Sequence, residues 1–128
     1  MHAIFYDLET SDKYTIGQIL NFSFITVDEH YSIIDEYNGR VKINRLQLPS
    51  PAAILANRID VTRHQQEAEL SEKEAAIGIY EYIAKQLSVN EKTSLIGFNS
   101  SRFDLPFLRT TFMRNGINPY FFGKLLYR

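Results

Sequence analysis

Three strand-like runs follow one another near the N-terminus, and they constrain the fold more than any other feature. Ala3–Leu8, Ile16–Val27 and Ser32–Ile43 are rich in β-branched and aromatic residues, although Asn38-Gly39 can interrupt the third run. The connections are short, and Asp28-Glu29-His30 separates the second run from the third. Strands joined so closely pair antiparallel. The sequence therefore predicts an antiparallel meander of three strands.

Helix-start signals replace this pattern after Leu48. Three capping patterns follow in order: Ser50-Pro51, Thr62 with Gln65, and Ser71 with Glu74. The last of these opens the clearest helix in the chain. Its apolar face at helical spacing is expected to comprise Ala76, Ile77, Tyr80, Ile83, Ala84 and Leu87.

A fourth strand and a last helix complete the pattern. Thr93–Phe98 is a short apolar run after a helix, so it is expected to join the sheet in parallel through a crossover. A helix is predicted from about Asp104 to Asn115, with Gly116 as its C-cap. The expected fold class is α/β: a mixed sheet, three strands antiparallel and one parallel, with helices packed on it.

Length and composition favour one folded domain that spans residues 1–128. The chain has 45% hydrophobic and 23% charged residues and no cysteine. It has no apolar run approaching about twenty residues, so no membrane span is expected. The start, Met-His-Ala-Ile-Phe-Tyr-Asp, is too short and too acidic for a signal peptide. We expect a cytoplasmic protein.

The charge is distributed unevenly. Residues 102–128 carry five basic residues and one acid, a net charge of +4, which leaves −5 on the rest of a chain whose total is −1. The basic residues are Arg102, Arg109, Arg114, Lys124 and Arg128. Such an end can face phosphates, or it can be a solvated helix surface.

Two acids stand at the end of the first apolar run. In a strand, Asp7 and Glu9 point to the same face with Cα atoms about 6.5 Å apart, and the two anions repel each other. Asp104 follows the parallel strand, so all three carboxylates converge if the two strands are neighbours. Such clusters suit Mg²⁺ or Mn²⁺, and a pair of ions can serve a phosphoryl displacement.

Simpler readings stay open for each acid. Asp104, two residues before Pro106, fits a helix cap, and Asp7 and Glu9 fit a solvent-exposed strand end. The three histidines, His2, His30 and His64, lack metal-ligand spacing and are expected on the surface.

Two segments resemble motifs of the DEDD (proofreading-type) 3′–5′ exonucleases. F-Y-D-L-E-T resembles the D-x-E-T first motif, and G-F-N-S-S-R-F-D (Gly97–Asp104) resembles the second motif as it occurs in bacterial exonuclease I. L-P-S-P-A-A-I-L-A-N-R-I-D-V-T and T-T-F-M-R-N-G-I-N-P-Y-F-F are similar to the segments between and after these motifs. The resemblance covers essentially the whole chain in the right order.

The resemblance implies a ribonuclease-H-like sheet whose strands lie in the order third, second, first, fourth, fifth. It implies two Mg²⁺ or Mn²⁺ ions and release of mononucleotides from the 3′ end of single-stranded DNA, as in DNA repair. The implied metal ligands are Asp7, Glu9 and Asp104. The implied substrate contacts are Thr10 against the terminal nucleotide, Val61 as an apolar wedge against the last base, and Asn99 and Arg102 as supports of the second motif.

The chain departs from the family after Asp104. The family's third motif supplies a His as general base and a fourth acidic ligand, but no Asp, Glu or His follows Asp104 here. We therefore expect the N-terminal part of an exonuclease domain, truncated before that motif and without the last strand and helix. Two functions follow: a metal-dependent exodeoxyribonuclease domain, or an inactive fragment that binds DNA or a protein partner.

The expected loss of the last strand has a further consequence. It would leave Ser94–Phe98 as an apolar edge of the sheet, which could pair with another chain. We therefore expect self-association through this edge.

Overall fold

A mixed sheet backed by helices makes up the part of the chain that the computed structural model describes, which is residues 1–11, 17–43, 61–97, 104–119 and 126–127, the backbone alone at residues 61, 104, 126 and 127. The strands are β1 (His2–Thr10), β2 (Ile19–Val27), β3 (Ile33–Arg40), β4 (Thr93–Gly97) and β5 (Leu126–Tyr127). The helices are α2 (Val61–Glu67), α3 (Glu72–Val89) and α4 (Asp104–Arg114).

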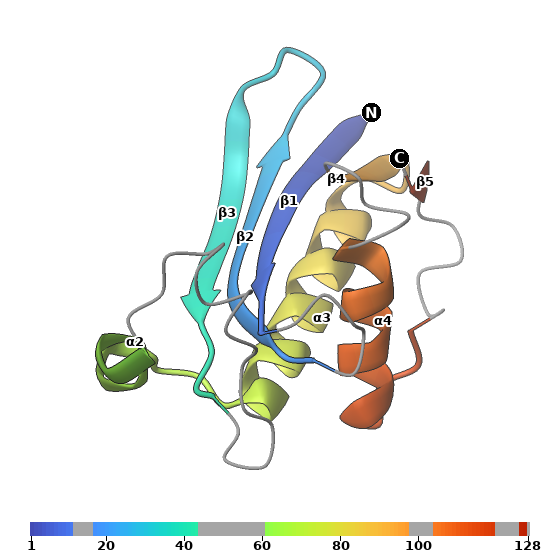
Figure 1. The fold of residues 1–128 in the computed structure, drawn as a ribbon. Helices are drawn as coiled ribbons and strands as arrows, with labels where there is room; N and C mark the ends of the chain where they lie inside the picture. The colour runs from blue at the N-terminus through green and yellow to red at the C-terminus, as the bar shows by residue number, and fades with distance from the viewer. Residues whose placement is uncertain (12–16, 44–60, 98–103, 120–125, 128) are drawn as a thin grey trace.

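The sheet has the strand order β3-β2-β1-β4-β5 (Figure 1). β1 pairs antiparallel with β2, and β2 with β3, through the short turn after Val27. β4 returns through α3 and pairs in parallel with β1. The predicted meander, crossover and mixed sheet are confirmed.

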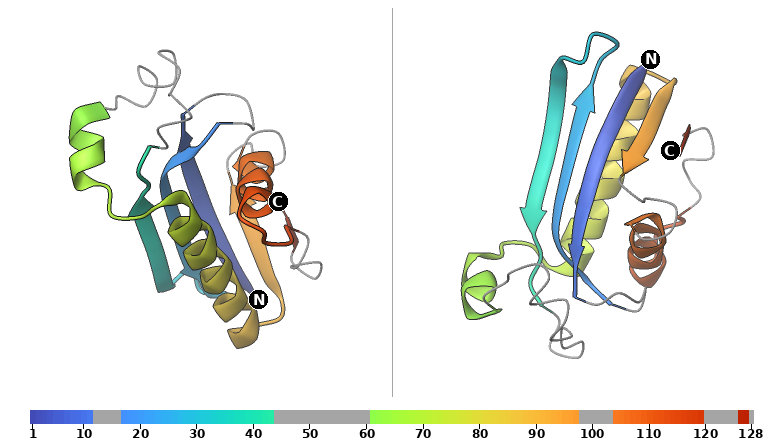
Figure 2. Two further views of the ribbon diagram at one scale, coloured as in Figure 1. Left: turned by 90° about the horizontal axis from the view of Figure 1, so that it is seen from below. Right: turned by 45° about the horizontal axis from the view of Figure 1, so that its top comes forward.

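One face of the sheet carries the helices. α3 and α4 lie on the same face, while α2 lies apart beyond the end of β3 (Figures 1 and 2). Ile4, Tyr6 and Leu8 of β1 point to this face and are 5% exposed or less. They share the core with Phe22, Phe24, Ile79, Ile83, Phe107 and Phe112. Within the described residues, no helix covers the other face, to which Phe5, Asp7 and Glu9 point.

The capping box that opens α3 is confirmed, but its buried face differs from the expected one. Ser71 Oγ accepts from the backbone N–H of Glu74, and Glu74 Oε1 accepts from that of Ser71. Ile77, expected in the core, is 39% exposed. The buried residues are Ala75, Ala76, Ile79, Tyr82, Ile83 and Gln86.

Polar partners in the sheet explain this rotation of α3. The Tyr82 hydroxyl lies 2.6 Å from Thr26 Oγ1 on β2, and Gln86 Nε2 donates to Asp35 Oδ2 on β3 at 2.8 Å. Tyr82 and Gln86, which are not part of the expected apolar face, therefore point toward the sheet. Their burial is tolerated because their polar groups are hydrogen-bonded.

The third strand runs through Asn38-Gly39, where the sequence allowed an interruption, and continues to Arg40. A Cβ atom at Gly39 would lie 2.5 Å from the Phe22 ring. The glycine therefore gives the Phe22 ring space within a continuous strand. At the end of α4, Gly116 has a φ of 75°, as expected of its helix-ending role.

The expectation of a wholly open β4 edge also needs correction. The backbone of β5 pairs in parallel with β4, Leu126 opposite Ser94 and Tyr127 opposite Leu95. Among the described residues of β4, Thr93 lies before this pairing, and Ile96 and Gly97 extend beyond it. Each helix in the described ranges is too short or too polar to cross a lipid bilayer.

Candidate metal centre at the carboxyl end of β1

The two acids of β1 lie where that strand outruns its parallel neighbour. Tyr6 and Gly97 form the last residue pair between β1 and β4. Asp7 and Glu9 follow, on the face opposite the buried Tyr6 and Leu8, so the prediction that they share one face is confirmed. Asp7 is exposed and Glu9 half-buried.

Glu9 has a hydrogen-bond donor on the adjacent strand. Asn21 lies directly opposite Glu9 in the β1–β2 ladder, and its Nδ2 donates to Glu9 Oε2 at 2.6 Å. Asp7 lies opposite Ser23, whose hydroxyl donates instead to Asn38 Oδ1 on β3 at 2.7 Å. Within the described part of the chain, neither acid forms an ion pair with a basic side chain.

A β-bulge follows immediately after Glu9. The register shifts between Glu9 and Thr10, so that Thr10 lies opposite Ile19 and Leu20 is the extra residue of β2. Bulges bend a strand and re-aim its side chains, and they are common beside active sites. Thr10, the residue after the bulge, is only 4% exposed.

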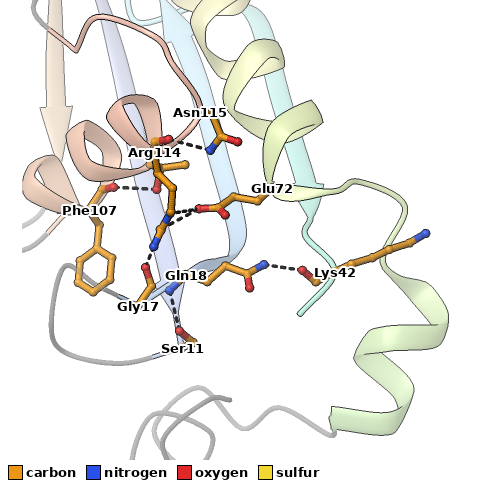
Figure 3. Close-up of polar contacts among 9 residues, drawn as sticks. Ser11, Gly17, Gln18, Lys42, Glu72, Phe107, Arg114 and Asn115 are labelled. Atoms are coloured by element: carbon orange, nitrogen blue, oxygen red, sulfur yellow. Dashed lines mark hydrogen bonds and ion pairs between the residues drawn. The ribbon is translucent and has the colours of Figure 1, made fainter. Parts of the chain in front are cut away.

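Hydrogen bonds between Ser11 and Gln18 join the two ends of the connection between β1 and β2 (Figure 3). The N–H of Ser11 donates to the Gln18 carbonyl oxygen at 2.8 Å, and the N–H of Gln18 donates back to Ser11 Oγ at 2.7 Å. The fully buried Gln18 side chain donates to the Lys42 carbonyl oxygen. The connection is thereby joined to the backbone that leaves β3.

Arg114 fixes the far end of α4 to the same connection (Figure 3). Its Nε donates to Glu72 Oε1 at 2.8 Å, and its Nη2 donates to the Gly17 carbonyl oxygen at 3.0 Å. This member of the basic C-terminal cluster is thus occupied within the fold, while Arg102, Lys124 and Arg128 lie outside the described residues.

Four predicted site residues cannot be placed by their side chains. Asp104 and Val61 are the first residues of α4 and α2, with the backbone alone described, and Asn99 and Arg102 lie outside the described residues. The structure therefore brings Asp7 and Glu9 together, and the convergence of Asp104 on them stays a prediction. Within the described residues, no three acidic, histidine or cysteine side chains form a metal-binding group.

The donors at the end of β1 are of the kind that a hard divalent cation prefers. Asp7 and Glu9 supply carboxylate oxygens on one face with no described cation to offset their repulsion. Asn21 Oδ1, beside Glu9, is buried and has no hydrogen-bond partner among the described atoms. These residues fit part of a site for a divalent cation.

Sequence reasoning missed Asn21 and misplaced His64. Asn21 is a polar residue within an otherwise apolar strand. Its place opposite Glu9 could be recognised only once the register between the two strands is known. His64, expected on the surface, is 5% exposed, with Nε2 2.7 Å from the Val41 carbonyl oxygen. It is buried because α2 packs against the backbone that follows β3, where that carbonyl needs a donor.

No protein-family model and no curated protein sequence matches the chain. Solved structures do match. E. coli exonuclease I in complex with a 5cy-dA13 oligonucleotide matches with a TM-score of 0.85 and 24% sequence identity, over 99% of this chain and 27% of that chain. The zinc-bound form of the E. coli exonuclease I complex with single-stranded DNA gives the same four values.

The chain shares the fold of exonuclease I. Product-bound exonuclease I agrees, with a TM-score of 0.84 and 24% identity over 99% of this chain and 29% of that chain. The ribonuclease-H-like sheet expected from the two motifs is thus confirmed. The chain spans less than a third of the length of these exonuclease I structures.

Proposed function

We propose that this chain carries part of the active site of a metal-dependent 3′–5′ exodeoxyribonuclease that acts on single-stranded DNA. The observation that carries the proposal is the placement of Asp7 and Glu9 on one face, just beyond the last β1–β4 pair. The exonuclease I structures with the same fold hold single-stranded oligonucleotides and, in one case, zinc, which supports this substrate and a divalent cation.

Asp7, Glu9 and Asp104 are the proposed ligands of two Mg²⁺ or Mn²⁺ ions. Such ions, when bound, stabilise the attacking and leaving oxygens of a phosphoryl displacement. Glu9 contributes an oriented carboxylate, because Asn21 holds one of its oxygens. The proposed contacts to the DNA end are Thr10, Val61, Asn99 and Arg102. We propose that the protein acts in the cytoplasm.

A second function, binding without turnover, is favoured by one sequence observation. No Asp, Glu or His follows Asp104, so this chain offers no residue for a general base or a fourth acidic ligand there. Loss of a general base lowers rates by about 10²–10⁴-fold. The isolated chain is therefore expected to bind single-stranded DNA and to degrade it slowly or not at all.

A single-stranded oligonucleotide labelled at its 3′ end separates the two functions. Purified chain is incubated with Mg²⁺ or Mn²⁺, and both release of label and retention of intact oligonucleotide are measured. Metal-dependent release that disappears in Glu9→Gln supports the exonuclease. Metal-dependent binding without release supports the second function. Glu36→Gln, an exposed acid on β3, is the matched control. DNA binding that is the same without metal, in Asp7→Asn and in Glu9→Gln would refute both functions.

A further inference from the structure

The amide of Asn21 is the one described side chain that holds Glu9, and we propose that it is a positioning residue for the metal site. The inference rests on the proposed function and adds to it a residue outside the two motifs. The 2.6 Å contact from Nδ2 to Oε2 joins residues that face each other in the β1–β2 ladder. A cross-strand pair of this kind is set by the backbone, so the donor is in place before any ligand binds.

The orientation of the amide follows from charge. Its oxygen would be repelled by the Glu9 carboxylate, so the nitrogen must face it. That orientation leaves Oδ1 buried and without a hydrogen-bond partner among the described atoms. A side chain placed only for packing would not leave an acceptor unpaired, since buried polar groups are normally satisfied. We therefore assign the role of Asn21 to its Nδ2 group, which donates to Glu9.

Among the described residues, Asn21 is the side chain that donates to Glu9. Arg40 lies opposite Asn21 on β3, but its guanidinium pairs with Glu67 on α2. Without the Asn21 donor, Glu9 would be a half-buried carboxylate repelled by Asp7, and it would rotate toward water. With the donor, Oε2 is held, and among the described residues Oε1 has no hydrogen-bond partner and is left for a cation. Groups that orient metal ligands in this way affect metal affinity strongly.

A double-mutant cycle on the full chain tests the inference, with Mn²⁺ as the probe. Asn21→Leu keeps the approximate volume and removes the donor, and Glu9→Gln removes the charge it acts on. Asn21→Leu is expected to weaken Mn²⁺ binding by about 10–100-fold in the wild-type background. In the Glu9→Gln background it is expected to have little further effect, because the interaction is already lost. Glu36→Gln, at an exposed side chain on β3, is the control and should leave Mn²⁺ binding unchanged.

The outcomes separate the inference from the proposed function. If Glu9→Gln leaves Mn²⁺ binding unchanged, the proposed metal site itself is wrong. If Glu9→Gln weakens binding but Asn21→Leu does not, or weakens it equally in both backgrounds, only the positioning role is overturned.

A measurement on the wild-type chain does not depend on how well Asn21→Leu folds. In a Mn²⁺ titration followed by nuclear magnetic resonance, the side-chain amide signals of Asn21 should broaden well before those of Asn38. Simultaneous broadening of both amides would mean that the ion does not lie at Glu9, and it would overturn the proposed site together with the inference.

Discussion

Arg114, the last residue of α4, is bound to Glu72, the first residue of α3. Two guanidinium nitrogens approach the same carboxylate oxygen, Nε at 2.8 Å and Nη2 at 2.7 Å. Both side chains are largely shielded, at 28% and 13% exposed. Because Nη2 also donates to the Gly17 carbonyl, this one arginine joins two helices to the connection that follows the candidate site.

Arg114→Met should destabilise the fold by about 1–3 kcal/mol, because Glu72 and the Gly17 carbonyl lose a charged donor. The comparable variant Arg63→Met removes an i,i+4 ion pair whose arginine is 75% exposed, so it should cost less than about 0.5 kcal/mol. Urea denaturation of the two variants measures the difference. Equal costs would show that the Arg114 contacts contribute no more than a surface pair.

Tyr82→Phe should cost about 1–2 kcal/mol, since it leaves Thr26 Oγ1 buried without its partner. Tyr31→Phe, at a side chain that is 82% exposed, is the control and should be neutral. Thermal unfolding of both variants is the measurement. A neutral Tyr82→Phe would mean that packing alone, and not this hydrogen bond, sets the rotation of α3.

Stability should also fall in alkali. Burial raises the pKa of Tyr37, and the charge of Glu81 raises it further; burial likewise raises the pKa of Tyr82, against the opposing hydrogen bond to Thr26. Above the ordinary tyrosine pKa of about 10, the unfolded chain loses protons that the folded chain keeps, so the free energy of unfolding decreases as pH rises. Urea titrations across this range measure the slope. Tyr82→Phe should flatten it, and an unchanged slope would contradict the assignment.

Asp104→Asn distinguishes a metal ligand from a helix-terminal residue. Asparagine keeps the size of the side chain and caps helices about as well as aspartate, so α4 should keep its stability. If Asp104 binds the metal with Asp7 and Glu9, the affinity for Mn²⁺ measured by calorimetry should fall by at least about tenfold. Removing a group that only hydrogen-bonds to a metal ligand already has an effect of that size. Asp7→Asn should do the same and Glu36→Gln should not. Tight binding of two ions that survives Asp7→Asn would refute the site.

Self-association is expected to be weak, because β5 already pairs with Ser94 and Leu95. Ile96 and Gly97 remain as a short edge, and Ile96→Lys should remove any dimer by placing a charge there. Sedimentation across a concentration series measures this. A strictly monomeric wild-type chain at high concentration, with hydrogen exchange at Ile96 as slow as in β1, would rule the edge out.

The order of strands and helices could be read from the sequence because it depends on local patterns. The apolar runs, the Ser71–Glu74 capping box and Gly116 each act within a few residues, and the structure confirms the elements they predict. The shared face of Asp7 and Glu9 is equally local, because alternate residues of any strand point the same way. The sequence by itself thus determined the antiparallel meander, the parallel fourth strand, the class of fold and the shared face of Asp7 and Glu9, but not the pairing of β5 with β4.

Contacts between distant residues were decided only by the tertiary structure. The strand register puts Asn21 opposite Glu9, and the packing of α2 buries His64 against the Val41 carbonyl. Thr26 and Asp35 turn Tyr82 and Gln86 into the core. In each case a polar side chain is satisfied by a partner on another element, and hydrophobic periodicity carries no information about that partner because it records only which residues avoid water.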